Sequence, residues 1–220
     1  MSQALAWLLN AITSVSWLEI IKALAPVVTA VIAFNALRNW QRQDKAKREA
    51  EFLEALIEAA HTYIADLPTP ITILEMAKIG MVSHAPTWEE GKESEIAVKG
   101  AIAFIGKNGE HQGKHLSEVL TTARSSMSKL RSLATKGQVF NFGDYTRCQN
   151  AVAMLTWHFD RMEGFANCIS SPTWNWENPD VGKLLNDAMS IDPNEIRRSV
   201  QDSNVALLEF ARVTYKRIYG

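Results

Sequence analysis

The segment between Trp17 and Trp40 constrains this chain most, because it has the length and composition of a membrane-spanning helix. It reads WLEIIKALAPVVTAVIAFNALRNW, and residues 23–37 contain no charged side chain. The 22 residues between the two tryptophans would extend about 33 Å as a helix at ~1.5 Å per residue. That length matches a hydrocarbon core of roughly 30 Å. Tryptophans at both ends are typical of membrane–water interfaces, so the segment predicts a membrane anchor.

Two topologies are compatible with residues 1–37, the predicted membrane segment. In the first, residues 18–39 cross the membrane once and the apolar residues before them form an interfacial or external helix. In the second, residues 3–18 and 23–37 form a helical hairpin, whose arms are short for a span of ~20 residues. A third alternative is a helix buried inside a soluble protein. The sequence leaves the number of spans open.

Three residues are unusual within this apolar segment. Glu19 and Lys22 are three positions apart and share a helix face. In a single span they would lie at the outer interface, where Lys22 can extend toward the headgroups. In the hairpin they would occupy the turn, and in an assembled pore or a partner contact they would be functional. Pro26 does not exclude a membrane helix, because neighbouring groups can satisfy the freed backbone carbonyl.

A basic cluster follows the apolar segment directly. Residues 38–48 contain one acidic residue, Asp44, and have a net charge of +4, whereas residues 49–220 have a net charge of −5. The basic residues are Arg38, Arg42, Lys45, Lys47 and Arg48. By the positive-inside rule, the C-terminal domain is expected in the cytoplasm, at a bacterial inner membrane. The basic residues would contact anionic lipid, and the acidic remainder argues against direct nucleic-acid binding.

The rest of the chain predicts an all-α protein, with the membrane segment followed by a cytosolic antiparallel helical bundle. A basic juxtamembrane helix over 38–66 continues into the bundle of residues 67–220. Thr87 and Glu90 resemble a capping box, and Gly106 and Gly109 predict a break between two helices. The clearest helical periodicity lies at about 144–170 and predicts a buried seam. Its members are Tyr145, Cys148, Val152, Leu155, Phe159, Met162, Ala166 and Ile169.

The sequence contains no motif that predicts catalysis, a cofactor or a metal. His111 and His115 have a spacing that can place two ligands on one helix face, but Gln112 stands where a zinc peptidase needs Glu. His158 lies off the predicted seam and is expected on the surface or facing a partner. Cys148 and Cys168 are 20 residues apart in one predicted helix, too far for a disulfide. We therefore expect no catalytic, cofactor-binding or metal-binding residue.

Trp174 and Trp176 lie in a segment rich in proline and asparagine, SPTWNWENPD. Such a segment predicts a loop between two helices. The tryptophans could cover one end of the helical bundle. Alternatively, they could anchor a protein partner, because aromatic side chains dominate interface energetics. The sequence favours the first interpretation and leaves the second open.

The stretch ALAPVVTAVIAFNALRNWQRQDKAKREAEFL, within residues 20–60, resembles the opening of small bacterial membrane-anchored helical proteins. These include membrane effectors of antiphage systems, among them the transmembrane proteins encoded with retrons. The resemblance implies a role in abortive infection, in which a reverse transcriptase with RNA–DNA holds the cytosolic domain inactive. On release, the membrane segment would damage the inner membrane. No catalytic residue is carried over by this resemblance.

The sequence therefore predicts a membrane effector, and two other functions remain as alternatives, a scaffold and an enzyme. In the effector, Trp7, Leu8 and Leu9 would associate with copies of themselves in a homo-oligomer and make the bilayer leaky. In a membrane-tethered scaffold or adaptor, the bundle would localise a protein partner and the anchor would be passive. In a membrane-bound enzyme, a site would form between helices. The lipid bilayer is an expected partner in every case.

Overall fold

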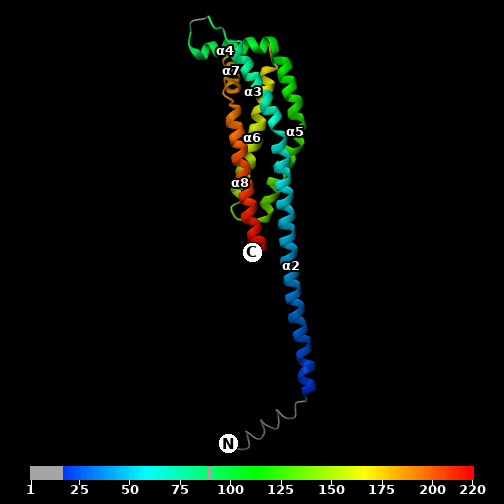
Figure 1. The fold of residues 1–220 in the computed structure, drawn as a ribbon. Coiled ribbons are helices and arrows are strands. Elements are labelled where there is room, and N and C mark those ends of the chain that lie inside the picture. The colour runs from blue at the N-terminus through cyan, green and yellow to red at the C-terminus, as the bar shows by residue number, and fades with distance from the viewer. Residues whose placement is uncertain (1–16, 89–90) are drawn as a thin grey trace, which may run out of the picture. The chain divides into compact units, whose positions relative to one another are not determined.

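The computed structural model describes residues 17–88 and 91–220, with side chains described from Ile21 onward. Within those residues there is no strand, and helices account for nearly all of the chain (Figure 1). The predicted all-α class is therefore confirmed for this part of the protein. The chain divides into two compact units, residues 1–49 and 50–220, and each is described separately below.

The first unit contains most of one long helix. Helix α2 comprises Trp17–Asp66 and passes through Pro26 without ending. One turn of it carries a side-chain hydrogen bond, from the Thr29 hydroxyl to the Ala25 carbonyl at 2.8 Å. Glu19 and Lys22 lie in helix and not at a turn. The first arm of the alternative hairpin, residues 3–18, lies almost entirely outside the described residues.

The second unit begins with the C-terminal part of α2 and contains the remaining helices. Pro68 starts the next helix, where its fixed φ and missing N–H are tolerated. These helices are α3 (Pro68–Ser83), α4 (Glu93–Phe104), α5 (Glu110–Lys136), α6 (Tyr145–Ile169), α7 (Pro179–Met189) and α8 (Pro193–Tyr219). A π-helical turn, Ile105–Gly109, joins α4 to α5, and a 3-10 helix, Gly137–Phe140, follows α5.

Two predicted boundaries are wrong. Helix α4 begins at Glu93 with Lys92 as its N-cap, so Thr87 does not cap it; Glu90 lies outside the described residues. The predicted break at Gly106 and Gly109 is a π-helical turn through which the helix continues. A Cβ atom at Gly109 would lie 2.2 Å from the Ile169 carbonyl oxygen. This glycine therefore permits close contact between two backbones and does not end a helix.

Helix α6 lies at the centre of the second unit, packed against α5 and α8 (Figure 1). All eight residues of the predicted seam are buried. The α6 backbone runs opposite to both neighbours: the Tyr145 hydroxyl donates to the Ala134 carbonyl at 2.7 Å, and the Tyr145 ring lies 5.6 Å from that of Phe210. The C-terminal part of α2 joins the same core, because the Tyr63 hydroxyl donates to the Leu155 carbonyl at 3.1 Å.

The short helix α7 is fixed at both ends. The Asn178 side chain accepts a hydrogen bond from the Asp180 backbone N–H and caps its N-terminus. The half-buried Lys78 ammonium of α3 donates to the carbonyl of Met189, the last residue of α7, and to that of Ile191 two residues further on. Helix α7 also packs on α6, and a cleft opens between them.

Candidate functional site

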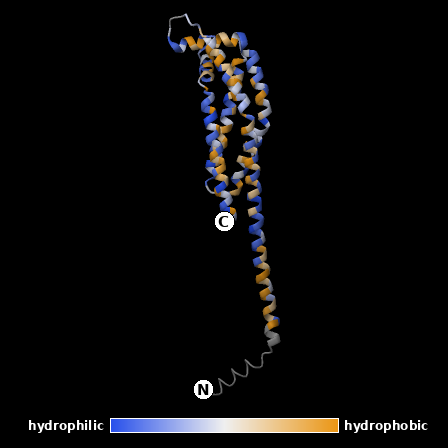
Figure 2. Ribbon diagram, viewed as in Figure 1, coloured by the Kyte–Doolittle hydropathy of each residue, from blue (hydrophilic) through white to orange (hydrophobic). Residues whose placement is uncertain are grey.

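The apolar segment of α2 is the first candidate, and it is exposed throughout. Every residue from 21 to 42 is exposed, and none of the most apolar window of this helix is buried. In Figure 2 this part of α2 is coloured as hydrophobic along its length, whereas the helices of residues 50–220 alternate hydrophobic and hydrophilic residues. The helix is long and apolar enough to cross a membrane. Its exposure contradicts the alternative of a helix buried inside a soluble protein.

The predicted interface residues fall on this helix where they are described. Lys22, Pro26 and Trp40 are exposed side chains of α2. Trp17 and Glu19 are in the helix, but their side chains lie outside the described residues, as do Trp7, Leu8 and Leu9. An exposed Trp40 at the C-terminal end of the apolar segment has the position expected for an interfacial tryptophan.

The basic cluster occupies the next turns of α2. Arg38 and Arg42 are exposed, as are Lys47 and the remaining two. Arg48 pairs with Asp44 one turn earlier, and the Lys45 ammonium lies 3.7 Å from a Glu49 carboxylate oxygen. These pairs offset part of the positive charge within the helix, so Arg38 and Arg42 have the strongest expected interaction with an anionic surface.

The predicted tryptophan pair borders a cleft, the second candidate site. The rings of Trp174 and Trp176 lie 5.9 Å apart. Trp176 packs against the core and Trp174 is exposed, so the two side chains have different surroundings. The sequence left covering the bundle end and contacting a partner as alternatives. In the structure, the packing of Trp176 fits a cover for the bundle end. The exposed Trp174 is the tryptophan that remains accessible to a partner.

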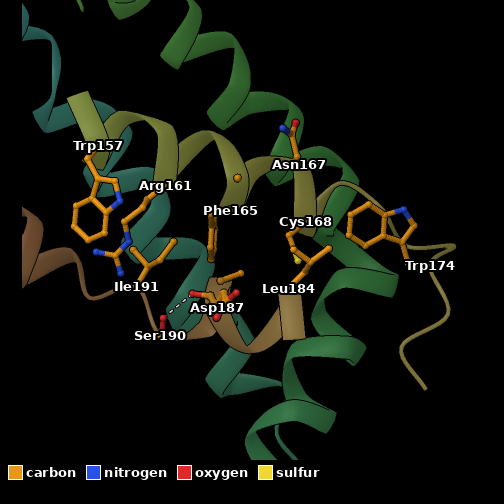
Figure 3. Close-up of a pocket in the computed structure, with 12 residues that line it drawn as sticks. Trp157, Arg161, Phe165, Asn167, Cys168, Trp174, Leu184, Asp187, Ser190 and Ile191 are labelled. Carbon is orange, nitrogen blue, oxygen red and sulfur yellow. Dashed lines mark hydrogen bonds between the residues drawn. The ribbon is translucent and has the colours of Figure 1, made fainter. Parts of the chain in front are cut away.

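The cleft lies between α6, α7 and the loop that carries Trp174, and has a volume of about 500 Å³ (Figure 3). This volume is in the range of small-molecule sites. Exposed apolar side chains border it: Trp157 is 46% exposed, Trp174 38% and Leu184 50%. The other lining residues are Arg161, Gly164, Phe165, Asn167, Cys168, Asp187, Ala188, Ser190 and Ile191.

Arg161 and Trp157 occupy one end of the cleft, and Trp174 the other (Figure 3). The guanidinium carbon of Arg161 lies 4.5 Å from the centre of the Trp157 ring, a cation–π contact. A carboxylate oxygen of Glu195 is 4.0 Å from the guanidinium, and the buried Nη1 atom of Arg161 makes no hydrogen bond. The arginine is thus positioned by an aromatic face while its donors are incompletely used.

The floor of the cleft is uncharged. Phe165 and Cys168 are both buried, and burial raises the pKa of the Cys168 thiol to about 11. The thiol is therefore protonated at neutral pH and weakly nucleophilic. Cys148 is a free, buried thiol as well, and burial raises its pKa to about 12. These two cysteines do not form a disulfide with each other, as their spacing predicted.

His158 is not where the sequence placed it. It was expected on the surface, but its side chain is 0% exposed, and neither ring nitrogen has a hydrogen-bond partner. Burial, followed by the nearby positive charge of Arg161, lowers its pKa, so the neutral form is favoured. The prediction failed because α6 contacts helices on several sides, and burial extends beyond one seam.

The remaining histidine pair shows no metal site. His111 and His115 are exposed at the start of α5. Among residues 17–88 and 91–220, no group of three or more histidine, cysteine or acidic side chains is arranged to hold a metal ion.

Over residues 17–88 and 91–220, these features define an all-helical protein with an exposed apolar helical segment and an aromatic cleft in its C-terminal unit. No protein-family model, no curated protein and no solved structure matches this chain. The functional argument therefore depends on the residues themselves.

Proposed function

We propose that this protein is a non-enzymatic membrane effector of a bacterial antiviral defence system of the abortive-infection, retron-associated type. In this proposal α2 spans the inner membrane, and residues 50–220 form an antiparallel helical bundle in the cytoplasm. A partner protein or ribonucleoprotein holds the bundle inactive. Release of the partner lets the membrane segments associate and make the bilayer leaky.

The observation that carries the proposal is the exposed apolar helix followed directly by basic residues. Residues 21–37 bury no side chain against the described chain. Exposing so many apolar groups to water is unfavourable by roughly 25 cal/mol per Å², which a bilayer would relieve. Arg38 and Arg42 would then lie at the cytoplasmic headgroups, in agreement with the positive-inside rule. The antiviral role is supported by the sequence resemblance of residues 20–60.

The experiment is to express the full chain in a bacterium and to follow growth and membrane potential with a dye. We expect depolarisation by the wild-type chain and none by a variant with Val28→Arg and Ile32→Arg, because each arginine opposes insertion by about 2.5–3.5 kcal/mol. The matched control carries Val28→Leu and Ile32→Leu, which keeps the segment apolar. Co-expression of the neighbouring genes should suppress depolarisation by the wild type. Equal depolarisation by the arginine variant would contradict the proposal.

A second candidate function is a passive membrane-tethered adaptor, and the exposed Trp157, Trp174 and Leu184 around the cleft favour it. Surface aromatics that border a concave site often anchor partners. Replacing residues 1–37 with an unrelated membrane anchor separates the two functions. An effector would lose its toxicity in this exchange, whereas an adaptor would retain its function in full.

A further inference from the structure

The cleft between α6 and α7 gathers partly exposed apolar groups around one concavity. Trp157, Trp174 and Leu184 keep between a third and a half of their area exposed, and they face the same concavity (Figure 3). Burial of those groups by an apolar ligand would be favourable in proportion to the area covered. The volume of about 500 Å³ is in the range of small-molecule sites.

The polar end of the cleft, at Arg161, indicates that the ligand also has a negatively charged group. Arg161 is the cation that lines the cleft; its side chain is 19% exposed and fixed against the Trp157 ring. Its partner Glu195 stays at 4.0 Å, too far for a hydrogen bond, and is itself half exposed. A desolvated guanidinium that lacks a close acceptor binds a planar carboxylate well, because charge-assisted hydrogen bonds are about twice as strong as neutral ones.

We propose that this cleft binds the anion of a fatty acid, with the carboxylate at Arg161 and the alkyl chain extending over Phe165 and Cys168 toward Trp174. The distance along α6 from position 161 to position 168 is about 10 Å at ~1.5 Å per residue, so the alkyl chain lies along two turns of the helix before it reaches Trp174. The neutral thiol of Cys168 forms part of an apolar floor. The proposal concerns residues 157–191 and is independent of membrane damage by α2.

Two acidic residues near the cleft sharpen the proposal. Asp187 lines the cleft and is exposed, so water screens its charge from the carboxylate. Glu195 competes with the ligand for Arg161. We therefore expect Glu195→Gln to tighten fatty-acid binding, a result that an apolar pocket without a role for Arg161 would not give.

The α7 side of the cleft is preformed. The Lys78 ammonium binds the carbonyls of Met189 and Ile191, so these groups at the end of α7 do not compete for the Arg161 guanidinium. The Asn178 cap fixes the other end of α7. A wall held at both ends loses little conformational entropy when a ligand binds, which favours affinity.

The test measures saturable binding of labelled dodecanoate to the full-length protein in lipid nanodiscs, with empty nanodiscs subtracted. Dodecanol and dodecylamine are the matched probes, since they have the same chain and no carboxylate. We expect one site for dodecanoate, and Arg161→Gln to weaken it about tenfold to a hundredfold, as for the loss of charge-assisted hydrogen bonds. Arg198→Gln, at an exposed arginine of α8 outside the cleft, is the control and should change nothing.

A second variant, Leu184→Trp, fills the cleft without touching Arg161 and should abolish binding. Its control, Val205→Trp, places the same side chain at an exposed position of α8. A diazirine analogue of dodecanoate should crosslink within residues 157–191. Equal binding of dodecanol and dodecanoate would overturn the proposal, as would unchanged binding in both cleft variants. A change in self-association on Leu184→Trp without saturable dodecanoate binding would overturn it too, and would assign the cleft to a second copy of this chain.

Discussion

Residues 21–42 of α2 and the helix α6 are both rich in apolar side chains, but the structure treats them in opposite ways. Every residue of the first is exposed, whereas α6 buries its entire predicted seam. The difference lies in the sequence pattern. Apolar residues in α6 recur every three or four positions and leave polar residues between them, which suits a partly solvated helix. In residues 23–37 they surround the helix on all sides, which suits a helix without water around it.

This contrast shows that hydrophobicity alone does not specify a partner. The seam of α6 is covered by this chain's own helices, including α5 and α8. The apolar segment of α2 is exposed in the described residues, which fits the proposal that a bilayer surrounds it. Substitutions in the two helices should therefore change different quantities. Those in α2 should change insertion into the membrane, and those in α6 should change the free energy of unfolding of residues 50–220.

The largest expected effect is on membrane insertion. Val28→Arg with Ile32→Arg places two charges in the middle of the apolar segment, and we expect about 5–7 kcal/mol less favourable insertion. The fraction of protein that stays with the membrane after an alkaline carbonate wash measures this. The Val28→Leu and Ile32→Leu control should remain in the membrane. Retention of the arginine variant would show that α2 is not the anchor.

The second-largest expected effect is on the free energy of unfolding, from a substitution in the buried seam of α6. Phe159→Ala removes a fully buried ring that lies 6.4 Å from the ring of Tyr63. We expect a loss of about 3–5 kcal/mol in the free energy of unfolding, measured by denaturant titration of the full chain in detergent. Ile32→Ala, an exposed aliphatic truncation in α2, is the comparison and should leave this unfolding unchanged. A loss below about 1 kcal/mol for Phe159→Ala would mean that the site collapses around the cavity.

The all-α class and the α6 seam could be predicted from the sequence because each depends on local pattern. The seam follows from helical periodicity, and all of its residues are buried. The close approach of α5 to α6 at Gly109 could not be predicted, because a glycine has the same appearance in a chain whether it ends a helix or admits a neighbour. Only the Ile169 carbonyl, 60 residues away, distinguishes the two.

The cleft itself was not predicted. The sequence singled out Trp174 by its place in a loop, as a cover for the bundle or a partner contact. Arg161 and Trp157 were missed, because they lie on α6 beside the seam and border a cleft only where α7 packs on α6. The burial of His158 was missed for a related reason, as α6 contacts more than one neighbour. Sequence periodicity predicts a single buried face of a helix, whereas a central helix such as α6 is buried on several faces.

The third prediction uses His158 to test this wider burial. Burial and the positive charge of Arg161 lower its pKa, while Glu195 raises it. The unfolded chain therefore binds a proton below about pH 6.5, near the ordinary histidine pKa, where the folded chain does not. Stability should be full above this pH and fall as the pH drops. His158→Leu should remove this dependence and add about 1–3 kcal/mol, because two unpaired buried nitrogens disappear.

Thermal unfolding of the full chain between pH 5 and 8 measures both parts of that prediction. His61→Leu is the matched control, because His61 is an exposed histidine of α2, and it should leave the pH dependence of the wild type intact. The same pH dependence in His158→Leu as in the wild type would show that another group titrates.

The smallest effect returns to α2, just beyond its apolar segment. Arg42→Gln removes one exposed positive charge from the basic cluster, and we expect about 1 kcal/mol weaker interaction with anionic lipid. Because Arg48 and Lys45 already have carboxylates nearby, Arg48→Gln should cost less than Arg42→Gln. The share of anionic lipid retained around the full chain after reconstitution from a mixture of anionic and zwitterionic lipid measures the difference, and Lys114→Gln, at an exposed lysine of α5, provides the baseline. Equal weakening of the interaction with anionic lipid at positions 42 and 48 would contradict this expectation. It would show that the ion pairs within the helix do not reduce the attraction to lipid, and that only the total charge of the cluster matters.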